Sequence, residues 1–119
     1  MIEELIGKTL VKIDKTDEKI IFHTLDGTAY RMSHYQDCCE SVTVEDICGD
    51  LDDLLNTPIV QAFEKTNSEN PPDVKKEFQD DSFTWTFYTL STIKGTVTIR
   101  WYGESNGYYS EDIEVELIK

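Results

Sequence analysis

The sequence predicts an α+β protein that is mostly antiparallel β-sheet, with about six or seven strands in a hairpin meander and one short helix. Two observations predict this class. Short runs of β-branched and aromatic residues alternate with polar residues along much of the chain. Clusters of Gly, Asn and Asp that favour turns separate these runs. At 119 residues, the chain has the length of a single domain, which we place at 1–119.

The first third of the chain carries the clearest strand signals. Apolar and β-branched runs cover Thr9–Ile13 and Lys19–Leu25, and a third run covers Thr28–Tyr35. Asp26-Gly27 lies between the second and third runs, and Asp-Gly is among the strongest hairpin signals. These residues predict a three-stranded meander.

The middle of the chain combines strand, helix and strand signals. Ser41–Glu45 alternates briefly and predicts a fourth strand, and Pro58–Phe63 predicts another. Between them, the segment from Gly49 to Asn56 predicts a short helix or a single turn, with Asp50 suited to cap it and Pro58 preventing its continuation.

The segment Thr66–Asp81 has the composition of a mobile loop, since it contains Asn, Ser and a Pro-Pro pair. Two strongly alternating runs then predict a hairpin, and Tyr108–Leu117 predicts a last strand. We expect four large side chains of the hairpin to fill the core rather than bind a ligand, since a small domain needs them there: Trp85, Phe87, Ile99 and Trp101.

The charge of the chain is strongly acidic and unevenly distributed. It carries 24 acids against 11 Lys and Arg, which gives a formal net charge of -13. Met32–Glu64 contains eight of the acids and no Lys or Arg. Nucleic acid is excluded as a favoured direct partner, because affinity for phosphates depends on cationic side chains. The natural electrostatic complement is a basic protein.

We therefore expect a partner-binding surface with two parts. The acidic part comprises Asp37, Glu40, Glu45, Asp46, Asp50, Asp52 and Asp53. The second part is a glycine-bracketed turn rich in Tyr, a residue that gives large contact area at small entropic cost, and comprises Ser105, Asn106, Tyr108 and Tyr109. The alternatives are that the acids form only a solvated face, and that the turn belongs to a well-packed hairpin.

Cysteine and histidine suggest chemistry but do not complete a site. Adjacent Cys38 and Cys39 would point to opposite faces of a strand, so we expect that they and Cys48 do not form a zinc site. Surrounding carboxylates would also disfavour a reactive thiolate beside His34. We expect no enzyme activity, no catalytic residue, no bound metal and no cofactor.

The N-terminus and the overall hydropathy favour a cytoplasmic protein. Met1–Leu5 has neither the positive start nor the apolar stretch of a signal peptide, and no segment has the length needed to span a bilayer. If the chain is encoded by a phage, we expect the host cell cytoplasm.

Two long motifs resemble a domain family of unknown function found in small phage, prophage and bacterial proteins. They are Gln36-Asp37-Cys38-Cys39-Glu40 and Ser105-Asn106-Gly107-Tyr108-Tyr109-Ser110. The resemblance covers nearly the whole chain and implies provenance. Small acidic phage proteins are often inhibitors of host defence, including anti-CRISPR proteins and DNA mimics.

The sequence and this resemblance together lead to one expected function and two alternatives. The expected function is a non-enzymatic, phage-type inhibitor whose acids occupy a basic, nucleic-acid-handling surface of a bacterial defence protein. One alternative is a sponge for a signalling nucleotide, for which Arg31, Lys94 and Arg100 are the plausible cations. The other is a metal-binding or structural accessory protein, centred on His34, Cys38 and Cys39.

Overall fold

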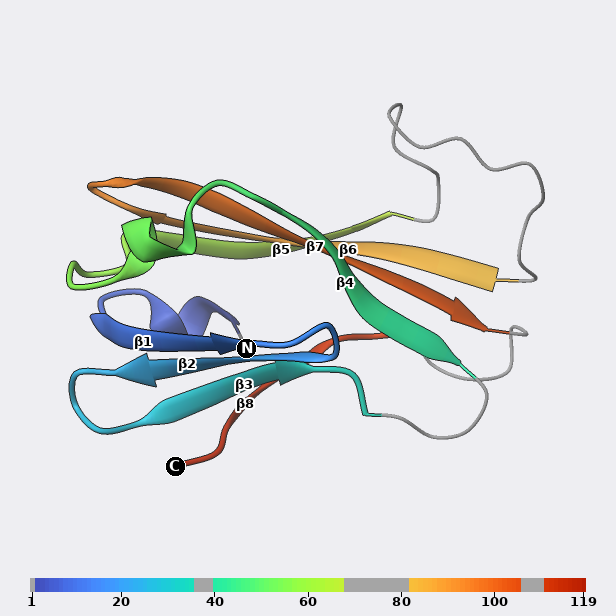
Figure 1. The fold of residues 1–119 in the computed structure, drawn as a ribbon, viewed down its shortest axis with the longest axis horizontal. Helices are drawn as coiled ribbons and strands as arrows, with labels where there is room; N and C mark the ends of the chain where they lie inside the picture. The colour runs from blue at the N-terminus through green and yellow to red at the C-terminus, as the bar shows by residue number, and fades with distance from the viewer. Residues whose placement is uncertain (1, 36–39, 68–81, 106–110) are drawn as a thin grey trace.

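Two four-stranded antiparallel sheets form the described part of the chain (Figure 1). This computed structural model describes residues 2–35, 40–67, 82–105 and 111–119. The first sheet has the order β1-β2-β3-β8, with β1 Leu10–Lys15, β2 Lys19–Thr24, β3 Ala29–Ser33 and β8 Glu114–Leu117. The second sheet has the order β4-β7-β6-β5, with β4 Ser41–Cys48, β5 Gln61–Asn67, β6 Ser82–Thr92 and β7 Gly95–Ser105.

The chain enters the second sheet after β3 and returns to the first sheet after β7. The predicted meander is confirmed, because β1 pairs with β2 and β2 with β3, all antiparallel. The predicted hairpin is confirmed as β6 and β7, which pair from Ser82 with Ser105 to Thr92 with Gly95. The last strand, β8, is shorter than predicted and pairs with β3 rather than with its neighbour in sequence.

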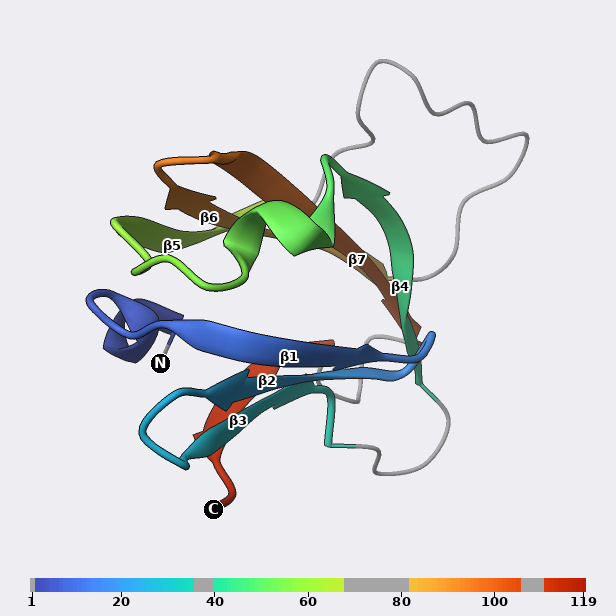
Figure 2. The same ribbon diagram turned by 60° about the vertical axis from the view of Figure 1, so that its left-hand side comes forward.

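The core lies between the two sheets, as the layers in Figures 1 and 2 show. The first sheet contributes Ile20, Phe22 and Met32, and the second contributes Tyr88, Leu90, Val97, Ile99 and Trp101, all at most 1% exposed. The Trp101 indole N–H contacts the sulfur of Met32 at 3.2 Å across the layers. A buried two-layer core of this kind fits a domain of this length.

The prediction that four hairpin side chains fill this core is confirmed for Ile99 and Trp101. Trp85 is also buried, but on the opposite face of the second sheet, where its ring contacts Tyr102 at 4.6 Å between centroids. Phe87 shares that outer face by alternation and is half-buried. Because β6 carries large apolar residues on both faces, its alternation cannot show which face points inward.

The structure corrects the predicted helix and the strand count. The segment after Asp50 forms a single 3-10 turn, η2 (Leu51–Leu54), and a second such turn, η1 (Ile2–Leu5), precedes β1. Neither is an α-helix, because four residues are too few to nucleate one. Eight strands rather than six or seven are present in the described ranges. Each of the eight overlaps a run that the sequence pattern identifies as a strand, including β4 and β5, so the predicted total was too low although the pattern was correct.

The first two residues of the predicted loop at 66–81 are part of a strand. Thr66 and Asn67 belong to β5 and pair with Thr86 and Trp85. Residues 68–81 lie outside the described ranges. Within those ranges, no helix has the length and apolar composition needed to cross a bilayer.

Candidate functional site

The acidic segment runs along the second half of β4 and continues into η2, as Figure 2 shows. Glu45, Asp46, Asp50 and Asp52 are exposed. We call these four residues the β4–η2 acidic surface. Asp53 is half-buried beside it. The surface lies on an edge of the second sheet, because β4 pairs only with β7 within that sheet.

A β-bulge between Val44 and Asp46 shapes this edge. A bulge inserts an extra residue, increases the local twist and changes the direction of the side chains. Glu45 is the extra residue here, and its carboxylate accepts a hydrogen bond from Nε of Arg100 at 2.5 Å. The Arg100 guanidinium also lies 5.1 Å from the centre of the Trp85 ring. The sheet therefore holds Glu45 by a charged contact and leaves Asp46 pointing to solvent.

Local hydrogen bonds fix the η2 part of the surface. The Asp50 carboxylate caps the turn by accepting from the Asp52 backbone N–H at 3.0 Å, as expected of an N-cap. The Asp53 carbonyl accepts from the Thr92 hydroxyl at 2.5 Å, which joins η2 to the end of β6. Asp50 and Asp53 thus have structural roles, whereas Asp52 is exposed.

Glu40 does not belong to this surface, although the sequence analysis grouped it with the other acids. Its side chain is 0% exposed, and its carboxylate contacts Nε2 of His34 at 2.9 Å. The His34 ring is 4% exposed, and its Nδ1 lies 2.7 Å from the carbonyl oxygen of Asp112. From this position Glu40 cannot contact a partner protein. It instead contacts His34, six residues earlier, and the other nitrogen of that ring makes the long-range contact to Asp112.

The fold adds two acids that sequence spacing did not reveal. The Val44 N–H donates to the carbonyl of Asp17 at 2.8 Å, which brings the β1–β2 turn against β4. Glu18 of that turn lines a hollow of about 270 Å³ with Ser41, Val42 and Thr43. Asp17 and Glu18 are exposed, so they extend the negative charge beyond Glu45. No local signal in the sequence indicates this contact, because it joins different sheets.

The other predicted partner-binding residues lie at or beyond the limits of the described ranges. Asp37, Asn106, Tyr108 and Tyr109 are outside those ranges. Ser105 is the last residue of β7. The predictions for these five residues remain predictions.

The three cations considered for a nucleotide site lie apart and are engaged within the chain. Arg31 on β3 contacts Glu116 at 3.0 Å. Arg100 contacts Glu45, as described above. Lys94, in the β6–β7 turn, donates to the carbonyl of Leu55 at 2.7 Å. The described structure therefore does not bring them together in one phosphate site.

The metal-binding alternative gains no support from the described residues. No group of three or more His, Cys, Asp or Glu side chains that could hold a metal ion lies among them. Both ring nitrogens of His34 already contact Glu40 and Asp112. Cys48 is a free, exposed thiol, while Cys38 and Cys39 are outside the described ranges.

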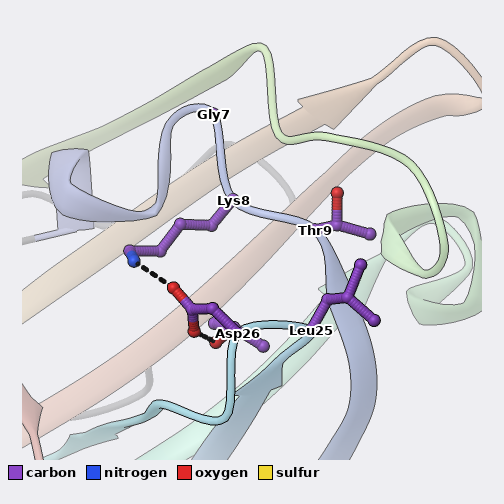
Figure 3. Close-up of a pocket in the computed structure, with 6 residues that line it drawn as sticks. Gly7, Lys8, Thr9, Leu25 and Asp26 are labelled. Atoms are coloured by element: carbon purple, nitrogen blue, oxygen red, sulfur yellow. Dashed lines mark hydrogen bonds and ion pairs between the residues drawn. The ribbon is translucent and has the colours of Figure 1, made fainter.

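A hollow of about 480 Å³ lies where η1 leads into β1, beside the β2–β3 turn (Figure 3). Its main polar group, the Asp26 carboxylate, accepts from the Lys8 ammonium at 3.0 Å and from the Thr28 hydroxyl at 2.7 Å. A hydrogen bond from Thr24 contributes most to holding the pKa of Asp26 well below its usual range, followed by those from Thr28 and Lys8. Thr24 and Thr28 of its own hairpin and Lys8, which precedes β1, satisfy the carboxylate, so we assign Asp26 a structural role.

A second acidic region lies between β5 and β8. There a cleft of about 690 Å³ is lined by Ile2, Glu64, Thr66, Thr86 and residues 112–116. Glu64 lies on the same face of β5 as buried Ala62, so it points towards the first sheet. Hydrogen bonding to Glu116 raises the pKa of Glu114 above its usual value. We call this region the β5–β8 cleft.

No curated protein and no solved structure matches this chain. The resemblance stated from the sequence is confirmed at the level of a family of unknown function. A family model described as "Domain of unknown function (DUF7448)" matches residues 3–115, so the chain belongs to that family.

Proposed function

We propose that this protein is a non-enzymatic inhibitor that binds a basic surface of a bacterial defence protein through the β4–η2 acidic surface. One observation carries the proposal. Glu45, Asp46, Asp50 and Asp52 are exposed along one strand edge and the turn that follows it. The segment that supplies them, Met32–Glu64, has no Lys or Arg of its own to neutralise them.

The proposed target surface is one that normally grips nucleic acid. Such surfaces present Arg and Lys to a row of phosphates, and carboxylates on a rigid edge can occupy the same cations. The bulge and the η2 cap hold the acids in fixed positions, which lowers the entropic cost of binding. Asp17 and Glu18 lie where they extend the contact.

The test uses the double variant Asp46→Lys/Asp52→Lys, which reverses the charge of two acids of the β4–η2 acidic surface. These two acids neither cap η2 nor form an ion pair within the described residues. The parent and the variant are compared for inhibition of a panel of purified CRISPR effectors and other nucleic-acid-cleaving defence proteins. We expect the parent to inhibit one member, and the variant to lose at least about tenfold in affinity, because it opposes like charges. Parent binding should also weaken as salt rises from about 0.05 to about 0.3 M.

The matched control is Glu3→Lys/Glu4→Lys, which changes the net charge equally at two exposed acids of η1. This control should inhibit like the parent. Thermal unfolding checks that both double variants keep the fold, since exposed charges usually change stability by about 0.5 kcal/mol or less each. If a folded Asp46→Lys/Asp52→Lys protein inhibits as well as the parent, the surface is only a solvated face.

A further inference from the structure

The buried His34–Glu40 pair lies in one connection between the two sheets and contacts the other. His34 follows β3 of the first sheet, and Glu40 precedes β4 of the second. Asp112 lies on the return path, between β7 of the second sheet and β8 of the first. The imidazole contacts both other residues, at 2.9 Å to Glu40 and 2.7 Å to Asp112. One side chain therefore joins the outgoing and the returning crossovers.

The geometry fixes where protons lie in this cluster. The partner of Nδ1 is a backbone carbonyl, which can only accept, so Nδ1 carries a hydrogen and donates it. Nε2 and the Glu40 oxygen would both be acceptors if neither held a proton. At 2.9 Å and almost without exposure to water, they must share one.

Further charges surround the pair on every element that packs against it. Two hollows beside His34 are lined by charged groups from the β1–β2 turn, from β2, from β3 and from β8: Glu18, Lys19, Arg31, Glu114 and Glu116. Asp112 precedes β8 and contacts the ring through its carbonyl. Three of these five groups are carboxylates and two are cations.

We propose that His34 and Glu40 form a proton-dependent latch that holds β8 against the first sheet, and that loss of the shared proton opens it. Without that proton, a carboxylate and a nitrogen lone pair face each other 2.9 Å apart with almost no exposure to water, an arrangement that is unfavourable for two buried acceptors. We expect the His34–Asp112 contact to break first, because Asp112 precedes β8 and this strand has only four residues. Within its sheet it pairs only with β3.

The experiment is amide hydrogen exchange in residues 113–119, measured from about pH 6 to about pH 8 and corrected for intrinsic exchange rates. Local opening that releases one proton becomes up to tenfold more favourable per pH unit. The parent should therefore lose protection in these residues as the pH rises, while the amides of β6 and β7 stay protected. The measurement needs no binding partner, so it is independent of the proposed function.

Glu40→Gln is the informative variant, because its amide can donate to Nε2 without the shared proton. Its protection at 113–119 should change little with pH. The matched control is His23→Gln, which removes the second of the two histidines in the sequence, at a half-exposed site beside Asp14. That control should behave like the parent. The latch is disproved if parent and Glu40→Gln show the same pH dependence, or if His23→Gln flattens it equally.

Discussion

The β4–η2 acidic surface and the β5–β8 cleft both concentrate carboxylates at an edge of the sandwich, but they use them differently. On the β4 side, Asp46 and Asp52 point to solvent. On the β5 side, Glu64 is also exposed but lies on the face of β5 that carries buried Ala62, towards the first sheet, and Glu116 contacts Arg31. The β4 edge is partly blocked by the Val44–Asp17 backbone bond, whereas a cleft lies between β5 and β8.

The difference shows that charge density alone does not identify a binding surface. An inward-pointing charge on an edge strand is a known means of discouraging aggregation through unpaired backbone groups. Glu64 on β5 fits that role. The β4 edge has a different protection, since a bulge and the β1–β2 turn interrupt it. Its exposed acids are therefore not needed for the same purpose, and this supports assigning them to a partner.

The largest effect on stability should come from Gly49→Ala, which disturbs the close packing of Gly49 against β7 beneath the β4–η2 surface. Gly49 has φ +111°, and a Cβ there would lie 2.7 Å from the carbonyl oxygen of Thr96 on β7. The substitution combines a strained backbone with a backbone clash, so we expect a loss of about 3 kcal/mol in unfolding free energy. Urea denaturation measures it.

The control for this substitution is Gly27→Ala in the β2–β3 turn. Gly27 also has a positive φ of +89°, but nothing lies within 4 Å of an added Cβ. We expect a loss of only about 1 kcal/mol, from the backbone strain alone. Equal losses in the two variants would mean that the close approach of Gly49 to β7 adds no cost to the Gly49→Ala substitution.

A smaller effect should distinguish the two regions when the arginine that pairs with an acid in each region is replaced. Arg100→Gln frees Glu45 and makes the β4–η2 surface more negative, so affinity for a basic partner should rise severalfold at low salt. Arg31→Gln frees Glu116 in the other region and should leave affinity unchanged. Each variant should lose about 1 kcal/mol or less in stability, because these ion pairs are partly exposed. Equal affinities for both variants would show that only the total charge matters.

Local signals in the sequence predicted those parts of the fold that depend on neighbouring residues. Alternation and Asp26-Gly27 correctly predicted the meander, and Asp50 was correctly identified as a cap. The pairing of β8 with β3 and the contact of His34 with the Asp112 carbonyl join segments far apart in sequence, so no local pattern carries them. The contact of Asp17 with β4 was missed for the same reason. Composition identified the acids of the candidate site, but only the fold distinguishes exposed from buried ones.

The smallest effect concerns Glu114 in the β5–β8 cleft. The pKa of this carboxyl is raised, first by hydrogen bonding to Glu116 and then by partial desolvation, so its charged form is disfavoured in the folded protein. Folding is therefore penalised at neutral pH, and the penalty disappears as the pH falls and the group takes up its proton. Glu114→Gln removes the charge, so the variant should be slightly more stable than the parent at neutral pH. This gain should shrink as the pH falls towards about 5, in thermal unfolding followed by circular dichroism.

The control is Asp52→Asn, which removes an exposed charge from the β4–η2 surface and should change stability little at any pH in that range. A gain for Asp52→Asn as large as that for Glu114→Gln would mean that overall charge repulsion, rather than the Glu114–Glu116 contact, limits stability.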